Sequence, residues 1–163
     1  MSKSITNIVL FCSVAGLLVL QGCSENSLGT VRVSGIVTLD SDPVEGVNVS
    51  FSPKSAEGRE AYGVTDAQGR FVLTVPGTNV GSGAIPGEYY VTMSKMSNPM
   101  EGINTDGMGI AEADAEIRKH FPRGIPSPKN LLPEKYASRT ATDIAPVKVE
   151  KGNKNNFTFD LMP

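Results

Sequence analysis

The feature that most constrains the fold of this chain is a strand–turn–strand pattern over residues 61–75. Its turn, TDAQGRF, contains Asp66, whose side chain can hydrogen-bond its own backbone, and Gly69, which tolerates the positive φ of tight turns. The apolar residues that follow at every second position are Phe71, Leu73 and Val75. A hairpin this short is marginal on its own, so further strands have to cover its apolar face.

Segments with the same alternation occur on both sides of this hairpin. In each, apolar residues take every second position, as in strands that bury one face, and the 17 Gly and 11 Pro residues favour turns over long helices. Besides the two hairpin strands, we expect strands at residues 30–39, 47–51, 88–95, 144–150 and 155–161. We therefore predict an all-β fold, a seven-stranded antiparallel β-sandwich. The aromatics expected between its two sheets are Phe51, Phe71, Tyr89, Phe157 and Phe159.

A long insertion at residues 96–143 separates the last two expected strands from the others. A loop of this length usually has structure of its own or a function. Residues 109–120 carry apolar side chains at helical spacing, with acidic residues near the start and basic residues near the end, as the helix dipole favours, and Pro122 ends the pattern. We predict one short helix in this loop, followed by a segment at residues 131–136 that returns apolar side chains to the sandwich.

The first residues have the pattern of a bacterial lipoprotein leader. Lys3 precedes a continuous apolar run at residues 8–20, which is shorter than the roughly 20 residues of a membrane span and fits the core of a signal peptide. The sequence LQGC at residues 20–23 resembles a lipobox, which implies cleavage before Cys23 and acylation of that cysteine. An uncleaved membrane anchor with an incidental cysteine is the alternative.

This leader predicts how the chain is divided and where it is held. We expect a lipoprotein signal peptide at residues 1–22, a lipidated tether at 23–29 and the β-sandwich at 30–163. Two or three acyl chains, such as palmitate, anchor a protein stably, so the membrane is the expected partner at Cys23. The expected location is a bacterial cell envelope, with the periplasmic side of the outer membrane favoured, because Ser24 follows Cys23 in place of the Asp that signals inner-membrane retention in some bacteria.

The rest of the sequence offers little chemistry. Cys12 lies in the leader and Cys23 is expected to be acylated, and His120 is the single histidine, so neither an ordinary zinc site nor a Ser-His-Asp arrangement is expected. The net charge of -2 provides no basic surface for nucleic acid. Asp40 and Asp42 flank a turn, and a weak calcium site there is left open. We predict no enzyme, no cofactor and no metal centre.

Four short motifs in order carry a resemblance to a known domain. GIV at residues 35–37, PVEGVNVSF at 43–51, TDAQGRF at 65–71 and PGEYYV at 86–91 together resemble the carboxypeptidase regulatory-like domain. The resemblance implies a transthyretin-like (prealbumin-like) sandwich, within the broader immunoglobulin-like class. With the lipobox, the chain is similar to small lipoproteins of planctomycete bacteria. The resemblance implies no activity, because the zinc domain of the carboxypeptidases and the histidines of the related hydroxyisourate hydrolase are missing from this sequence.

Display and binding are therefore the expected functions. We predict a non-enzymatic, lipid-anchored envelope protein whose sandwich is a structural or binding module. The alternative is a carbohydrate- or peptide-binding accessory protein to a separate envelope enzyme, with an envelope protein or a glycan as partner. The aromatics considered for binding are Tyr62, Tyr89, Tyr90 and Tyr136. Of these, Tyr90 is preferred because alternation directs it outward, and Tyr136 is the second candidate. The insertion is the other expected place for a partner.

Overall fold

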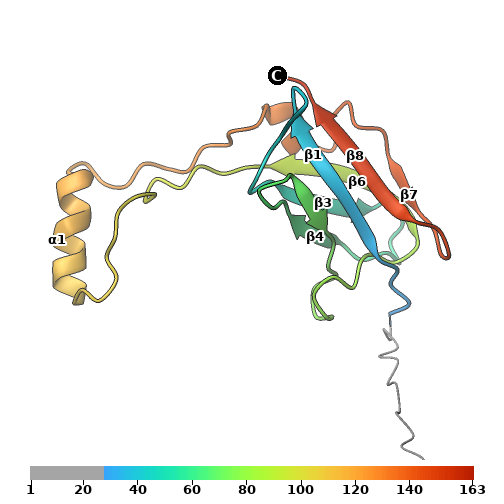
Figure 1. Ribbon diagram of the computed structural model, residues 1–163, viewed down its shortest axis with the longest axis horizontal. Coiled ribbons are helices and arrows are strands. Elements are labelled where there is room, and N and C mark those ends of the chain that lie inside the picture. The colour runs from blue at the N-terminus through green and yellow to red at the C-terminus, as the bar shows by residue number, and fades with distance from the viewer. Residues whose placement is uncertain (1–27) are drawn as a thin grey trace, which may run out of the picture.

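The computed structural model describes residues 28–163, which form two β-sheets and one projecting helix (Figure 1). The elements in chain order are β1 (Val33–Leu39), β2 (Asp42–Pro43), β3 (Asn48–Pro53), β4 (Ala61–Val64), β5 (Arg70–Val72), β6 (Gly87–Ser94), α1 (Ile110–His120), the 3-10 helix η1 (Glu134–Ala137), β7 (Val147–Val149) and β8 (Asn155–Leu161). The chain is thus β-rich, as the alternating pattern predicts.

The first sheet is built around β1. The last strand, β8, runs parallel to β1 and pairs with all of it, from Val33 opposite Asn155 to Leu39 opposite Leu161. Because β8 occupies one edge of β1 throughout, the antiparallel strands β5 and β2 share the other edge, one after the other. The short β2 follows β1 through a two-residue turn in which Asp40 and Ser41 have φ of 53° and 68°.

The second sheet has the order β4-β3-β6-β7, and all its neighbouring pairs are antiparallel. The described chain therefore has eight strands in two sheets, one of them mixed, which differs from the expected seven antiparallel strands. Alternation reveals which side chains face inward, but it does not reveal the direction of the neighbouring strand. The two-residue β2 is too short to produce a pattern.

The two sheets pack face to face around an aromatic centre. Phe51 of β3 lies with its ring centroid 5.7–6.4 Å from four other rings, three of them on the opposite sheet. Those rings belong to Phe71, Tyr89, Phe157 and Phe159. All five are buried except Phe157, which is half-buried against the core, so the prediction that these aromatics fill the space between the sheets is confirmed.

Gly35 in the middle of β1 makes room for this centre. A Cβ atom at this position would lie 2.3 Å from the carbonyl oxygen of Phe157 and 2.6 Å from the ring of Phe71. Both separations are far below van der Waals contact, so any side chain here would force β8 or the ring away. The glycine that interrupts the apolar face of β1 therefore marks close packing.

The predicted hairpin at residues 61–75 divides between the two sheets. Its turn has the expected chemistry: the Asp66 carboxylate accepts hydrogen bonds from the backbone N–H groups of Gln68 and Arg70 at 2.9 and 2.8 Å, and Gly69 has a φ of 70°. Beyond the turn, β4 pairs with β3 whereas β5 pairs with β1. Tyr62 and Thr74 stay opposite each other and exchange both backbone hydrogen bonds. The hairpin is thus a link between the sheets.

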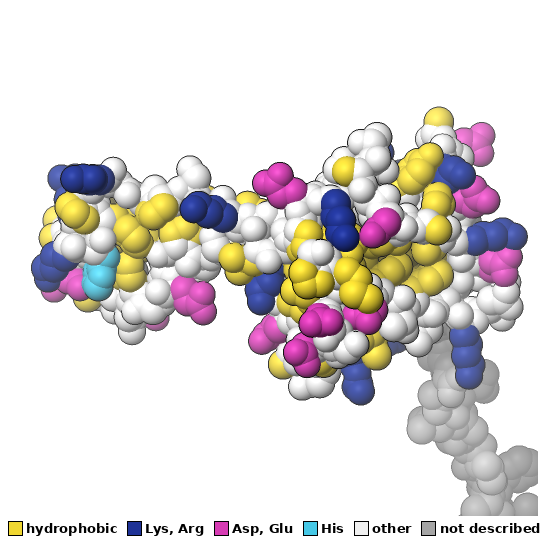
Figure 2. Space-filling view, turned by 90° about the horizontal axis from the view of Figure 1, so that it is seen from above, with side chains coloured by type: hydrophobic (Ala, Val, Ile, Leu, Met, Phe, Trp, Pro, Cys, Tyr) yellow, Lys and Arg dark blue, Asp and Glu magenta, His cyan; other side chains and the backbone are white. Residues whose placement is uncertain are grey.

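The insertion carries α1 away from the sandwich on two extended arms (Figures 1 and 2). The helix begins one residue after the expected start, ends at the expected His120, and has no buried residue. The arms pair where they leave the sandwich, through backbone hydrogen bonds of 2.7 Å from Ser97 to Lys129 and from Leu131 to Lys95. The returning arm then buries Leu132 and Tyr136, as predicted for residues 131–136.

Candidate functional site

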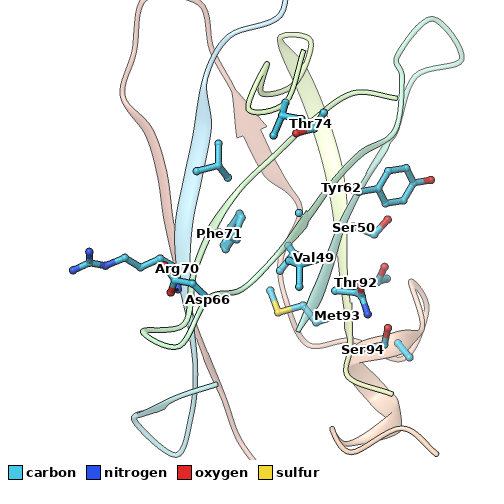
Figure 3. A pocket seen from close by; sticks show the side chains of 16 residues that line it. Val49, Ser50, Tyr62, Asp66, Arg70, Phe71, Thr74, Thr92, Met93 and Ser94 are labelled. Carbon is cyan, nitrogen blue, oxygen red and sulfur yellow. Dashed lines mark hydrogen bonds between the residues drawn. The ribbon is translucent and has the colours of Figure 1, made fainter. Parts of the chain in front are cut away.

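A groove of about 870 Å³ lies along the β4-β3-β6 sheet, where β4 and β5 diverge (Figure 3). Side chains of β3, β4 and β6 that alternate with core residues form one part of its lining. Val72 of β5 and Thr74 beyond it form another part, together with the core residues Val49, Phe71 and Met93 and with Ala137 of η1. The groove thus results from the splitting of the hairpin between two sheets.

Cross-strand register arranges the outward side chains of the groove in two rows. Ser50 of β3 is directly opposite Tyr62 on β4 and Thr92 on β6. One step along the sheet, the second row consists of Val64, Asn48 and Ser94. Residues directly opposite each other in antiparallel strands have Cβ atoms about 5 Å apart, so each row is a closely spaced set.

Four of these side chains carry hydrogen-bonding groups that their own chain does not use. Within residues 28–163, the side chains of Asn48, Ser50, Thr92 and Ser94 make no hydrogen bond to another residue. The side-chain hydrogen bonds on this face lie next to the groove instead, among Ser52, Glu60, Tyr62 and Arg139. The groove therefore presents one side-chain amide, on Asn48, and three hydroxyls to a ligand.

A polar network holds Tyr62 at the rim of the groove. Its hydroxyl donates to the Glu60 carboxylate, which also accepts hydrogen bonds from Arg139 at 3.0 Å and from Ser52 at 3.2 Å. Arg139 Nη2 in turn donates to Ser52 Oγ at 2.6 Å. Since the hydroxyl is fixed and the residue stays 42% exposed, the ring is oriented in advance and still accessible.

The charges of this network favour one arrangement of protons. The hydrogen bond from Tyr62 holds the pKa of Glu60 below its usual value, and the same hydrogen bond raises the pKa of the Tyr62 hydroxyl. At neutral pH Glu60 is therefore a carboxylate and Tyr62 a phenol that donates to it. Glu60 and Tyr62 are thus already in the protonation states that their hydrogen bond requires.

Tyr90, the preferred sequence-based candidate, points outward as alternation predicts, but it lies outside the groove lining. It is half-buried on β6 opposite Ser52, and the Lys54 ammonium lies 5.8 Å from the centre of its ring. Lys54 is held by a 2.9 Å ion pair with Glu88. Tyr90 thus lies beside the groove without lining it, and its binding role stays a prediction from the sequence alone.

Tyr136, the second sequence-based candidate, belongs to the core. It is 2% exposed, its hydroxyl donates to the backbone carbonyl of Met162 at 3.2 Å, and the Met162 N–H donates to the hydroxyl at 2.8 Å. The side chain ties the returning arm to the end of β8. Cys23, the expected lipidation site, lies outside the described residues.

The remaining sequence-based possibilities lie apart from the groove. Asp40 and Asp42 are exposed at the β1–β2 turn, and Asp160 holds that turn by accepting from the Ser41 N–H at 3.0 Å. Over residues 28–163, no group of three or more His, Cys, Asp or Glu side chains is placed to hold a metal ion. His120 is on α1, beside Glu116.

The groove residues were only partly visible in the sequence. Alternation assigns Ser50, Thr92 and Tyr62 to an outward face, but many outward residues satisfy that pattern. Their meeting depends on the register between β3, β4 and β6 and on the divergence of β5, and neither leaves a local signal.

No protein-family model, curated protein or solved structure shows detectable similarity to this chain. The fold and the groove define a β-rich protein of two packed sheets, with a surface groove lined by both apolar and polar residues. None of the helices in the described part of the chain is long and apolar enough to cross a membrane.

Proposed function

We propose that this chain is a non-enzymatic, lipid-anchored protein of a bacterial cell envelope, and that its two-sheet domain binds an uncharged glycan in the groove. The anchor part of the proposal is supported by the leader pattern that ends in Cys23. The same pattern and Ser24 support the periplasmic side of the outer membrane. Four ordered motifs support a transthyretin-like sandwich of the carboxypeptidase regulatory-like kind.

The observation that carries the binding part is the unused polar floor beside an exposed aromatic ring. Sugars are bound through hydrogen bonds from their hydroxyls to side-chain amides and hydroxyls, and through packing of their C–H faces on aromatic rings. Asn48, Ser50, Thr92 and Ser94 supply the first kind of contact, and Tyr62 supplies the second. The groove thus has both elements of a sugar site in one place.

The charges around the groove favour an uncharged ligand. Its charged lining residues are Asp66 and Arg70, one of each sign. Asp66 already accepts two backbone hydrogen bonds in its turn, so its carboxylate stabilises the turn and is less available to a ligand. An acidic or basic ligand would therefore meet no surplus of opposite charge. A neutral or zwitterionic sugar polymer fits this balance.

A peptide ligand, the other half of the alternative, is less well suited to this surface. Extended peptides commonly bind by adding a strand to a sheet edge, where backbone groups are free. The floor of the groove is formed largely by the face of the β4-β3-β6 sheet, which offers unused polar side chains. This distinction favours a glycan over a peptide.

An array that carries neutral glycans, anionic glycans and peptides tests the ligand class. The full-length protein, purified from membranes in mild detergent, should be retained on neutral glycans, and a soluble form of the same glycan should compete. Retention should change little between low and moderate salt, because few charges take part. Retention on peptides alone, on anionic glycans alone, or on none of the three classes would contradict the proposal.

A further inference from the structure

The helix α1 is unusual because the described part of the chain covers little of it: Ile117 and Phe121 are half-buried beside the returning arm, and no helix residue is fully buried. It has 11 residues, none of them buried, and it stands apart from the sandwich at the end of two arms (Figures 1 and 2). Isolated helices shorter than about 12 to 15 residues are marginal in water, and most helices gain their stability by packing an apolar face. This helix therefore has only a small part of the packed face that usually stabilises one of its length.

An apolar stripe runs along one side of α1. Its members recur at helical spacing and are Ile110, Ala113, Ile117 and Phe121. Ile110 is 93% exposed, and Ile125 of the returning arm, which lines a small hollow with Ile117 and Phe121, is 51% exposed. The stripe is thus continuous with apolar residues of the arm, fully open at Ile110 and half-buried at its other three members. Figure 2 shows hydrophobic side chains gathered on this lobe.

The charges of α1 change sign along its length. The acidic residues Glu112, Asp114 and Glu116 come first, with Glu116 just past the middle of the helix, and the basic residues Arg118, Lys119 and His120 follow. Within one helix they form exposed pairs, Arg118 with Asp114 at 2.9 Å and Lys119 with Glu116 at 2.6 Å. Exposed pairs of this kind contribute little and rearrange easily.

We propose that α1 packs antiparallel against α1 of a second copy of this chain, around a two-fold axis near the middle of the helix. In this arrangement the two apolar stripes cover each other. Asp114, which borders the stripe, faces Arg118 of the second copy, and the reverse contact forms at the same time. The two helix dipoles are also antiparallel, which favours their association.

The division of charge selects a second copy over other partners. A uniformly acidic or basic partner helix would be repelled by one half of α1, and a parallel copy would place like charges opposite each other. In an antiparallel copy Glu112 and Asp114 face the basic end of the second helix, and only Glu116, near the axis, lies across from its own counterpart. The sandwich does not take part, because the arms hold α1 clear of it.

Charge-exchange variants of the full-length protein test this pairing. Two differently tagged copies, coexpressed and purified in mild detergent, should coprecipitate when both are wild type. Asp114→Arg alone should reduce self-coprecipitation at least tenfold, and so should Arg118→Asp alone, because each places like charges across the axis. Coexpression of Asp114→Arg with Arg118→Asp should restore it, since every contact across the axis is then attractive. The double variant on one chain is the matched control and should also self-associate.

Two outcomes would overturn the proposal. One is equal coprecipitation of wild type and both single variants. That result would mean that the copies associate through shared micelles or another interface, and not through α1. The other is failure of the mixed pair to recover association. Thermal unfolding of the sandwich should be the same for all variants, because α1 buries no side chain. Glycan retention measures binding in the groove separately from self-association through α1. Glycan retention without self-association, or self-association without glycan retention, therefore distinguishes the two proposals.

Discussion

Replacing Phe51 by alanine should lower the free energy of unfolding by about 3 to 5 kcal/mol, the range for a large aromatic removed from a packed core. The residue is fully buried, and its ring contacts aromatic rings from both sheets. Removal would therefore leave a cavity at the point where the sheets meet. For a domain whose total stability is about 5 to 15 kcal/mol, this is a large share. Equilibrium denaturant unfolding, followed by circular dichroism, measures the change.

A matched control for this change is Val80→Ala. It also removes apolar side-chain atoms, but from a residue that is 96% exposed in the loop between β5 and β6, so the expected change is within about 0.5 kcal/mol. A loss of less than about 1 kcal/mol for Phe51→Ala would show that the ring is not at the centre of the packing.

Replacing Cys23 by serine should remove the protein from the membrane fraction by blocking acylation. The expected reason is the loss of two or three acyl chains, each of which contributes about 0.8 kcal/mol per buried CH₂ group. Fractionation of cells, combined with the intact mass of the protein, measures both membrane location and lipid attachment. Cys12→Ser is the matched control, because that cysteine lies in the segment expected to be cleaved away. A membrane pool and a lipid mass unaltered by Cys23→Ser would contradict the anchor.

The parts of the fold that depend on local pattern could be predicted from the sequence. Alternation identified the inward aromatics, Asp66 and Gly69 identified the turn, and helical spacing identified α1 to within one residue at its start. Each of these features is set by neighbours in the chain. The physical preferences of a few adjacent residues are enough to specify them.

The parts that depend on distant pairing could not be predicted in this way. The parallel partnership of β1 with β8 joins the two ends of the described domain, and either strand direction satisfies the same alternation. The splitting of the hairpin likewise depends on which sheet β5 joins, and in the structure β5 pairs with β1. The groove is a consequence of both, so its residues were recognisable as outward but not as neighbours.

Tyr136 shows how an aromatic residue in a loop can be misread. Alternation does not apply to an irregular segment, so an exposed binding role and a tucked-in role were both compatible with its sequence. The structure places it in the core, because its ring closes the space at the end of β8 and its hydroxyl satisfies the Met162 backbone. The aromatic residue that lines the groove with an exposed ring is Tyr62, which lies opposite Ser50.

The most direct test of the account compares glycan affinity between two matched tyrosine variants. Tyr62→Ala and Tyr90→Ala each remove one outward tyrosine from the same sheet, but only Tyr62 lines the groove. Calorimetric titration of the folded full-length variants with the glycan retained on the array should show at least a tenfold loss for Tyr62→Ala, about 1.4 kcal/mol, and less than a twofold change for Tyr90→Ala. Equal affinities for both variants and wild type, or a loss confined to Tyr90→Ala, would contradict binding in the groove.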